Sequence, residues 1–268
     1  MIKQKTVGLA LGSGEFRGFA HIGVIRSLEK HGIPIDYLSG SSIGAWVAAS
    51  YAIFKDSDRL ETDLTDKPRE NWAILLDFSW NGGLISGQKF SKFLESSLQH
   101  YSFSDTQIPL QIVASDLVIG KAHIFDKGDI AQAVRASTSV PLVFKPMSYE
   151  NKLLVDGGLC NPVPGNLLKA KGADVVIGVN LYNRKEFTGN KLSVANIAIR
   201  AMRIFLYNLA DESLRHCDVV IQMDLSKYIK VSSFSQYFTK KIAEEIIKIG
   251  ERETDKAIPR IKELLGLK

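Results

Sequence analysis

The segment 40–44, Gly-Ser-Ser-Ile-Gly, constrains the fold more than any other, because it places a Gly-x-Ser-x-Gly pattern between a predicted strand and a predicted helix. A short apolar run at 35–38 precedes it, and helix-forming residues at 45–52 follow it. Such a turn holds the central serine in a strained, exposed conformation, and the flanking glycines allow the bend. Ser42 then lies at a helix N-terminus, which favours developing negative charge. The pattern predicts that Ser42 is the nucleophile of an acyl hydrolase or acyl transferase.

The first fifty residues alternate between strands and helices. An apolar strand is predicted at 6–11, a glycine-rich loop at 12–18 and a helix with apolar residues at helical spacing at 19–31. This order indicates an α/β protein, a three-layer α/β/α fold with a mostly parallel central sheet. Further strands are predicted at 110–114, 122–125, 153–155, 174–179 and 218–221, and helices at 88–99, 129–136, 194–214 and 242–265.

The composition fits one globular domain. The 268 residues are 45% hydrophobic and 24% charged, with no internal repeat or low-complexity linker, so we expect a single domain over 1–268. The more polar stretch 54–108 is predicted to form a cap or lid beside the sheet. No apolar run approaches the ~20 residues of a membrane helix, and we expect a soluble, cytoplasmic protein. Cys160 and Cys217 form no metal-binding pattern, so no metal or cofactor is expected.

The charge balance says little about partners. The net charge of +5 is compatible with an anionic membrane surface or with nucleic acid and argues for neither. A basic helix carries Arg200, Arg203 and Arg215 at or near it, and its basic side faces either solvent or anionic lipid. We expect no nucleic-acid partner and leave peripheral membrane contact open.

Three predicted strands end in segments that suit one acyl-transfer site. The loop 12–18 ends the first strand, Ser42 the second, and Asp156 the strand at 153–155. Ligands of open parallel sheets bind beyond the carboxyl ends of the strands, so we expect these segments to meet there. Asp156 then serves as the base for the Ser42 hydroxyl, provided that burial raises its pKa. Amide groups of the loop stabilise the tetrahedral oxyanion.

Four blocks of the sequence resemble the patatin-like phospholipase family, in the family's order and spacing. They are LALGSGEFRGFAHIGV at 9–24, GSSIGA at 40–45, AVRAS at 133–137 with Val140 and Pro141 after it, and DGG at 156–158. One block alone would be a weak signal, whereas four in order are specific. The resemblance covers nearly the whole chain and implies the patatin-like version of the three-layer fold.

The resemblance implies a function and a set of site residues. It implies hydrolysis of lipid acyl esters, such as phospholipids, lysophospholipids or simpler carboxyl esters, by a serine–aspartate dyad without a catalytic histidine or a metal. The dyad maps onto Ser42 and Asp156. The oxyanion hole maps onto Gly12, Ser13, Gly14 and Glu15, with Arg17 beside them, and the supporting motif glycines are Gly40, Gly44, Gly157 and Gly158.

The glycine-rich loop departs from the family's pattern, which often has glycine where this chain has Ser13 and Glu15. If the backbone at Glu15 requires a positive φ, a glutamate there costs roughly 1 kcal/mol or more. Its carboxylate also opposes a nearby oxyanion unless it points to solvent or pairs with Arg17. A lipid- or acyl-binding regulatory protein with an impaired hydrolase site therefore remains an alternative.

A histidine-based site is the other alternative, as in an acyl-carrier transacylase. Ser42, Asp156 and His216 follow one another in the order of a hydrolase triad. However, His216 is predicted between a helix end and a strand start, at the wrong edge of the sheet, which favours the dyad. His21 is predicted to pack or cap beside the loop. Trp72 and Trp80 line an acyl pocket or belong to the core.

Overall fold

The computed structural model describes residues 5–65, 86–98, 100–183, 194–225, 228 and 239–267. The strands in this part of the chain form one mixed sheet. The strands of this described part are β1 (Val7–Leu11), β2 (Tyr37–Ser41), β3 (Leu110–Asp116), β4 (Lys121–Phe125), β5 (Met147–Tyr149), β6 (Lys152–Val155), β7 (Val175–Asn180) and β8 (Val219–Gln222). Their order is β5-β6-β3-β2-β1-β7-β8, and β4 also pairs with β3.

The centre of the sheet is parallel. Strands β3, β2, β1, β7 and β8 run in one direction, and β4, β5 and β6 are paired antiparallel at one side. Every residue of β1 and of β7 is buried, because helices cover both faces of the sheet. The predicted α/β architecture with a mostly parallel sheet is confirmed.

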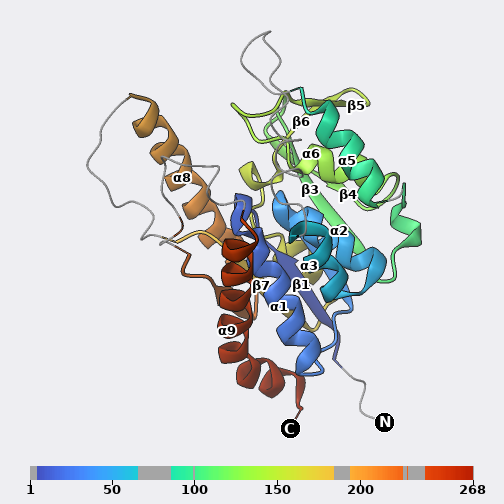
Figure 1. Cartoon of the computed structure of the whole chain (residues 1–268), viewed down its shortest axis with the longest axis vertical. Coiled ribbons are helices and arrows are strands. Elements are labelled where there is room, and N and C mark those ends of the chain that lie inside the picture. The colour runs from blue at the N-terminus through green and yellow to red at the C-terminus, as the bar shows by residue number, and fades with distance from the viewer. Residues whose placement is uncertain are drawn as a thin grey trace.

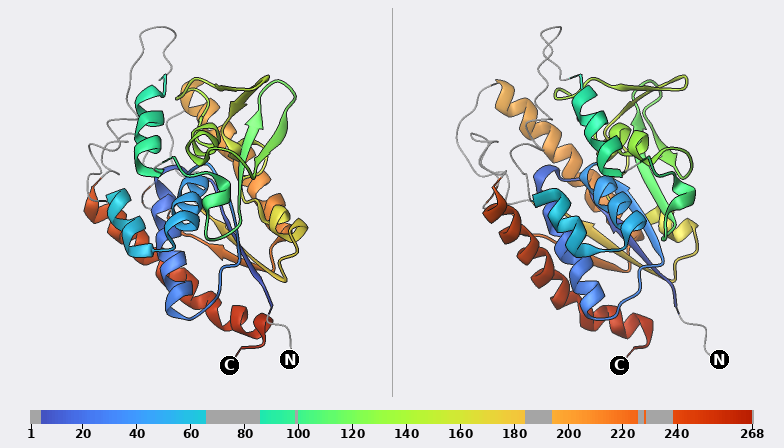
Figure 2. Two further views of the ribbon diagram at one scale, coloured as in Figure 1. Left: turned by 90° about the vertical axis from the view of Figure 1, so that its right-hand side faces the viewer. Right: turned by 45° about the vertical axis from the view of Figure 1, so that its right-hand side comes forward.

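Helices cover the two faces of the sheet and complete the three layers (Figures 1 and 2). The helices are α1 (Phe19–Lys30), α2 (Ile43–Phe54), α3 (Ser57–Thr65), α5 (Gln88–Leu98), α6 (Ile130–Ser137), α7 (Gly165–Ala170), α8 (Val194–Ser213) and α9 (Lys240–Leu265). The larger apolar core includes residues of α1, α2, α5, α6 and α9, while α7 and Leu214 pack in a smaller core against Ala10 and Val176. None of the described helices combines the length and apolar character needed to cross a bilayer.

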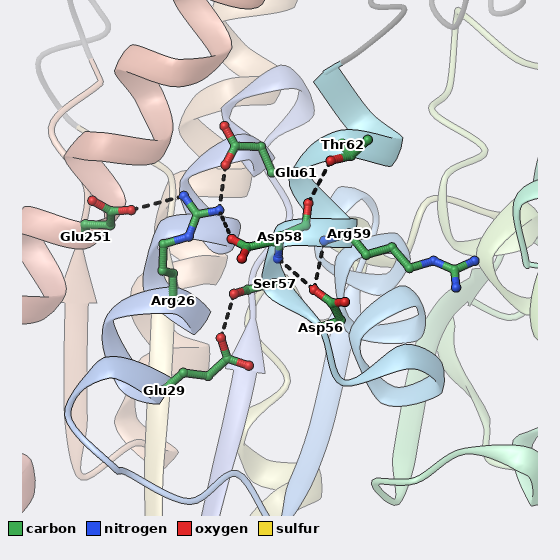
Figure 3. Close-up of polar contacts among 9 residues, drawn as sticks. All are labelled: Arg26, Glu29, Asp56, Ser57, Asp58, Arg59, Glu61, Thr62 and Glu251. Atoms are coloured by element: carbon green, nitrogen blue, oxygen red, sulfur yellow. Dashed lines mark hydrogen bonds and ion pairs between the residues drawn. The ribbon is translucent and has the colours of Figure 1, made fainter.

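A polar cluster ties the start of the predicted cap to the body of the protein (Figure 3). The Arg26 guanidinium on α1 donates to Asp58 and Glu61 of α3 and to Glu251 of α9. Glu29, one turn further along α1, accepts a hydrogen bond from the Ser57 hydroxyl at 2.6 Å. Since these contacts add to the buried apolar side chains of α3, that helix belongs to the helical layer around α1.

The other described part of the stretch 54–108 also packs against the body. Helix α5, predicted at 88–99, packs on α2 through Phe90 and Phe93, whose rings meet Trp46 edge-on at centroid distances of 5.8 and 5.6 Å. Leu94 and Leu98 are fully buried. Trp72 and Trp80, predicted to line an acyl pocket or to belong to the core, lie outside the described residues.

Candidate active site

Ser42 occupies a sharp turn between β2 and α2. Its backbone has φ 55° and ψ −125°, a region that residues other than glycine rarely adopt. The flanking glycines are required by space, because a Cβ on Gly44 would lie 2.1 Å from the Leu11 carbonyl oxygen and one on Gly40 would lie 2.5 Å from the Gly44 carbonyl oxygen. The turn therefore presses the start of α2 against β1 and fixes the direction of the serine side chain.

Ser42 and Asp156 lie in direct contact. The Ser42 hydroxyl donates to Asp156 Oδ2 at 2.6 Å, and Asp156 Oδ1 accepts the Gly158 amide at 2.8 Å. The Asp156 carbonyl accepts a hydrogen bond from the Ser115 hydroxyl on β3 at 2.8 Å. Both carboxylate oxygens are thus engaged, and the carboxylate is held against the serine oxygen.

The strand that precedes Asp156 is antiparallel to its neighbour. The sequence predicts a strand at 153–155 that ends at Asp156 and gives it no direction, and in the structure β6 is antiparallel to β3, with Val155 opposite Ser115 and Leu154 opposite Asp116. The strand starts beyond the carboxyl edge of β3 and returns toward it. Asp156 still reaches the predicted edge, because β6 pairs only with the last two residues of β3.

Burial changes the acidity of Asp156. Loss of hydration raises the pKa of its carboxyl from 3.8 to about 6, while hydrogen bonds from Ser42 and Gly158 act in the opposite direction, and the negative charge of Glu15 adds to the rise. A base with this pKa is ionised at neutral pH and binds a proton more readily than a solvated aspartate does. Burial therefore makes the Asp156 carboxylate more basic than a solvated aspartate.

The end of α6 and the residues after it support both members of the pair, a role that the sequence reasoning missed. The Ser42 amide donates to Ser137 Oγ at 2.8 Å, and the Asp156 amide donates to the Ser139 carbonyl at 3.0 Å. The buried Arg135 guanidinium donates to Ser139 Oγ at 2.6 Å. The block at 133–137 carries the signal, since it belongs to the family resemblance, but the sequence alone gives it no role.

The backbone amides of the predicted oxyanion loop fall into two groups, those that are hydrogen-bonded to backbone carbonyls and those that are not. The Gly12 amide donates to the Val179 carbonyl at 3.1 Å and the Ser13 amide to the Pro162 carbonyl at 2.9 Å, so these two amides are occupied within the protein. No such bond joins the amides of Gly14 and Glu15 to an acceptor in the described ranges. In the described ranges, the amides of Gly12 and Ser13 are thus bonded to backbone carbonyls, and those of Gly14 and Glu15 are not.

Side chains fix the orientation of the available part of the loop. Arg17, which is buried, donates through Nε to the Gly14 carbonyl at 2.8 Å and through its guanidinium to the Leu181 carbonyl at 3.2 Å. It also lies over the Tyr182 ring, 5.0 Å from the centroid. Since carbonyl and amide point in opposite directions in a trans peptide, a fixed Gly14 carbonyl also fixes the direction of the Glu15 amide.

Ser13, a departure from the family's usual glycine, has a specific partner. Its hydroxyl shares a hydrogen bond with the Tyr182 hydroxyl, and the two oxygens are 3.0 Å apart. Burial raises the pKa of the Tyr182 phenol above its ordinary value, which keeps the phenol protonated. The Ser13 side chain therefore joins the loop to the segment after β7.

Neither His216, the histidine of the alternative triad, nor His21 beside the loop is hydrogen-bonded to Ser42, whose hydroxyl donates to Asp156. His21 is fully buried, its Nε2 donates to the Gly12 carbonyl at 2.8 Å, and burial lowers its pKa to about 4, so it is a neutral packing residue, as predicted. His216 is exposed and lies in the turn Leu214–His216 before β8, at the amino edge of the sheet. Within the described ranges, no group of three or more potential ligand side chains is arranged to hold a metal ion.

Glu15 has a positive φ of 58°, the backbone conformation in which a glutamate is strained. Its side chain is exposed. We expect Glu15→Gly to raise the free energy of unfolding by up to about 1 kcal/mol, because glycine tolerates this conformation. Because the Glu15 charge contributes to the raised pKa of Asp156, the variant should also shift the acid limb of esterase activity to lower pH.

Chemical denaturation and a pH–rate profile measure these two effects. Glu150→Gly is a matched control, since Glu150 is also an exposed glutamate with a positive φ of 51°. It should gain stability without moving the acid limb. An unchanged or higher acid limb in Glu15→Gly, or a large loss of activity, would contradict the assigned effect of Glu15.

The fold and the site together define a class of protein: a three-layer α/β/α domain with a Gly-x-Ser-x-Gly turn at the carboxyl edge of its parallel strands. Within that class, residues 9–168 match the patatin-like phospholipase family, and the chain belongs to this family.

Curated relatives and a solved structure are similar to this chain. An uncharacterized NTE family protein of Mycobacterium bovis is 35% identical over 176 residues, which cover 65% of this chain and 49% of that protein. The lysophospholipase NTE1 of Meyerozyma guilliermondii is 29% identical over 185 residues, 68% of this chain and 13% of that protein. VipD from Legionella pneumophila has a TM-score of 0.61 at 14% identity, covering 98% of this chain and 67% of that one. The chain spans less than half the length of these two curated relatives.

Proposed function

We propose that this protein is a serine acyl-ester hydrolase that acts on lipid esters through Ser42 and Asp156. The single observation that carries the proposal is the 2.6 Å hydrogen bond from the Ser42 hydroxyl to Asp156, made by a serine in a strained turn to a carboxyl with a raised pKa. A serine needs a positioned base to become nucleophilic, and this geometry supplies one.

The reaction follows from the positions of these groups. Asp156 accepts the hydroxyl proton as Ser42 Oγ attacks the ester carbonyl carbon, and the carbonyl oxygen becomes an oxyanion. Asp156 then returns the proton to the departing alcohol oxygen, which leaves an acyl group on Ser42. Water attacks this acyl-enzyme with Asp156 again as base, which releases the carboxylic acid and restores the hydroxyl.

The amides of Gly14 and Glu15 are proposed as the donors to the oxyanion. Support comes from the occupied amides of Gly12 and Ser13 and from the Arg17 contact that orients the Gly14–Glu15 peptide. The Ser42 amide is excluded from this role here because it donates to Ser137. Removal of one oxyanion donor typically costs about 100- to 1000-fold in rate.

The proposed substrates are phospholipids, lysophospholipids and simpler carboxyl esters. Support comes from membership of the patatin-like phospholipase family and from similarity to proteins named lysophospholipase NTE1. A catalytically impaired lipid-binding protein is the second candidate, since Glu15 places a carboxylate beside the loop and its charge acts on Asp156.

Fatty-acid release from a lysophospholipid, together with hydrolysis of a water-soluble p-nitrophenyl ester, tests the proposal. We expect turnover of both by the wild-type protein, without added metal and with unchanged rates in the presence of a chelator. Absence of turnover on every ester by folded protein would overturn the hydrolase proposal in favour of the lipid-binding one.

A further inference from the structure

In the described part of the chain, large apolar side chains are exposed in consecutive positions at Ile204 and Phe205 of α8 and at two places whose backbones contact segments of the candidate active site. Val118 is 74% and Ile119 is 62% exposed in the turn between β3 and β4, next to the half-exposed Leu117. Leu142 is 76% exposed in the loop after α6, next to the partly exposed Val143. Single exposed apolar residues are ordinary on a soluble protein, whereas contiguous ones mark interaction surfaces. The five residues at these two places are called the apolar rim below.

Hydrogen bonds fix the backbone of the β3–β4 turn, whose apolar side chains are exposed. The Val118 amide donates to Asp116 Oδ1 and the Gly120 amide to the Asp116 carbonyl, both at 2.9 Å. The Leu117 amide donates to the Leu153 carbonyl of β6 at 2.8 Å. Hairpin turns usually carry glycine, asparagine, aspartate or serine, so apolar residues are not needed to form this turn.

Both parts of the apolar rim are directly connected to the candidate active site. Asp116, at the base of the first turn, pairs with Leu154 of β6, two residues before Asp156. The second loop begins just after Ser139, whose carbonyl accepts the Asp156 amide, and its Val143 amide donates to the Val140 carbonyl. In Figures 1 and 2, the green and yellow-green loops around β4, β5 and β6 lie at one end of the molecule, and both termini lie at the other.

Two lysines accompany the apolar rim. Lys121 follows the first turn and Lys145 follows the second loop, and both are exposed. Neither lysine forms an ion pair with the described residues. Exposed apolar side chains bordered by lysines suit the interface of an anionic bilayer, where the apolar groups enter the acyl region and the ammonium groups meet anionic headgroups.

We propose that the apolar rim docks the protein on an anionic lipid bilayer, with the Ser42 edge of the sheet toward the lipid. The proposal rests on the proposed function in one respect: the docked lipid is then the source of the ester. It places membrane contact on the rim beside Asp156 rather than on the basic helix around Arg200 and Arg215.

Vesicle sedimentation tests the proposal in a Ser42→Ala background, where binding is measured without turnover. The probe is phosphatidylcholine vesicles with and without phosphatidylglycerol. We expect the double variant Val118→Ser with Ile119→Ser to bind the anionic vesicles at least about tenfold more weakly, since two apolar side chains no longer enter the bilayer. Lys121→Gln should lose about fivefold, and only on the anionic vesicles.

Val220→Ser is the matched control, because Val220 is an apolar residue 42% exposed on β8, away from the apolar rim. Added to the Ser42→Ala variant, which is the parent of this comparison, it should leave vesicle binding unchanged. The proposal is overturned if the parent fails to bind anionic vesicles, if the double variant binds like the parent, or if the control loses as much. A parent dimer that dissociates in the double variant would assign the rim to a second copy of the chain instead.

A separate assay distinguishes failure of docking from failure of the proposed function. With Ser42 intact, the double variant should hydrolyse a monomeric p-nitrophenyl ester at the wild-type rate and lose at least about tenfold on vesicle lipid, in proportion to its weaker binding. Vesicle binding without any esterase activity would leave the docking inference standing and remove the hydrolase. Esterase activity without vesicle binding would leave the hydrolase standing and remove the docking inference.

Discussion

Ser42→Ala is expected to abolish ester hydrolysis, with a fall in kcat/KM of about 10⁴-fold or more, because the variant lacks the oxygen that forms the acyl-enzyme. It should also lose all covalent labelling by a fluorophosphonate, which reacts only with an activated serine. The wild-type protein should gain the mass of a single adduct, and intact-protein mass spectrometry measures both results. The variant should fold normally, because the substitution keeps the backbone amide bond to Ser137 and removes only the hydroxyl that donates to Asp156.

Ser50→Ala is the matched control for this variant. Ser50 is a buried serine on α2, the helix that starts after Ser42, and it has no place in the proposed mechanism. It should label and turn over like the wild type. Labelling that persists in Ser42→Ala, or that disappears in Ser50→Ala, would contradict the assignment of the nucleophile.

The sequence was sufficient to predict the part of the site that depends on local backbone geometry. The Gly-x-Ser-x-Gly pattern predicted the turn because its glycines meet a steric requirement that no larger residue satisfies, as the 2.1 Å approach of a Gly44 Cβ to Leu11 shows. The parallel strands were predictable because continuous apolar runs are typical of strands buried on both faces. The amphipathic tail at 242–265 was likewise found as α9.

Features that depend on pairing between distant segments were not predictable. The four residues of β6 have no periodicity that specifies a direction, so the antiparallel pairing with β3 was missed, and so was the three-residue β5. Helices α3 and α7 were also missed, since each is short and carries few apolar positions. The division of the loop amides depends on the carbonyls of Val179 and Pro162, which lie far from the loop in the sequence.

The hydrogen bond between Ser137 at the end of α6 and the backbone of Ser42 was not predictable for the same reason. A serine hydroxyl at 137 that accepts the Ser42 amide is apparent only when the two segments meet, 95 residues apart in the chain. The order of the motifs in the sequence led to the proposal that Asp156 is the base. The direct hydrogen bond from Ser42 to Asp156 supports that proposal.

Asp156→Asn is expected to remove activity while making the protein more stable at neutral and alkaline pH. Asparagine can still accept the Gly158 amide and contact Ser42, but it has no basicity, so kcat/KM should fall by about 10²- to 10⁴-fold or more at every pH. In the wild type, kcat/KM should decline below about pH 6 as Asp156 is protonated. A pH–rate profile of both proteins on a soluble ester measures these effects.

The stability effect follows from the sign of the pKa shift. Because the folded-state pKa of Asp156 is raised from 3.8 to about 6, the folded protein binds the proton more tightly than the unfolded chain does. The free energy of unfolding therefore falls as pH rises from about 4 to 6 and stays lower above that range. An asparagine side chain does not ionise, so the Asp156→Asn variant should exceed the wild type by about 2–3 kcal/mol at pH 8 and by little at pH 4. Urea denaturation at the two pH values measures the difference, and equal stabilities at pH 8 would mean that the buried carboxylate carries no such cost and that its proposed activation as a base is wrong.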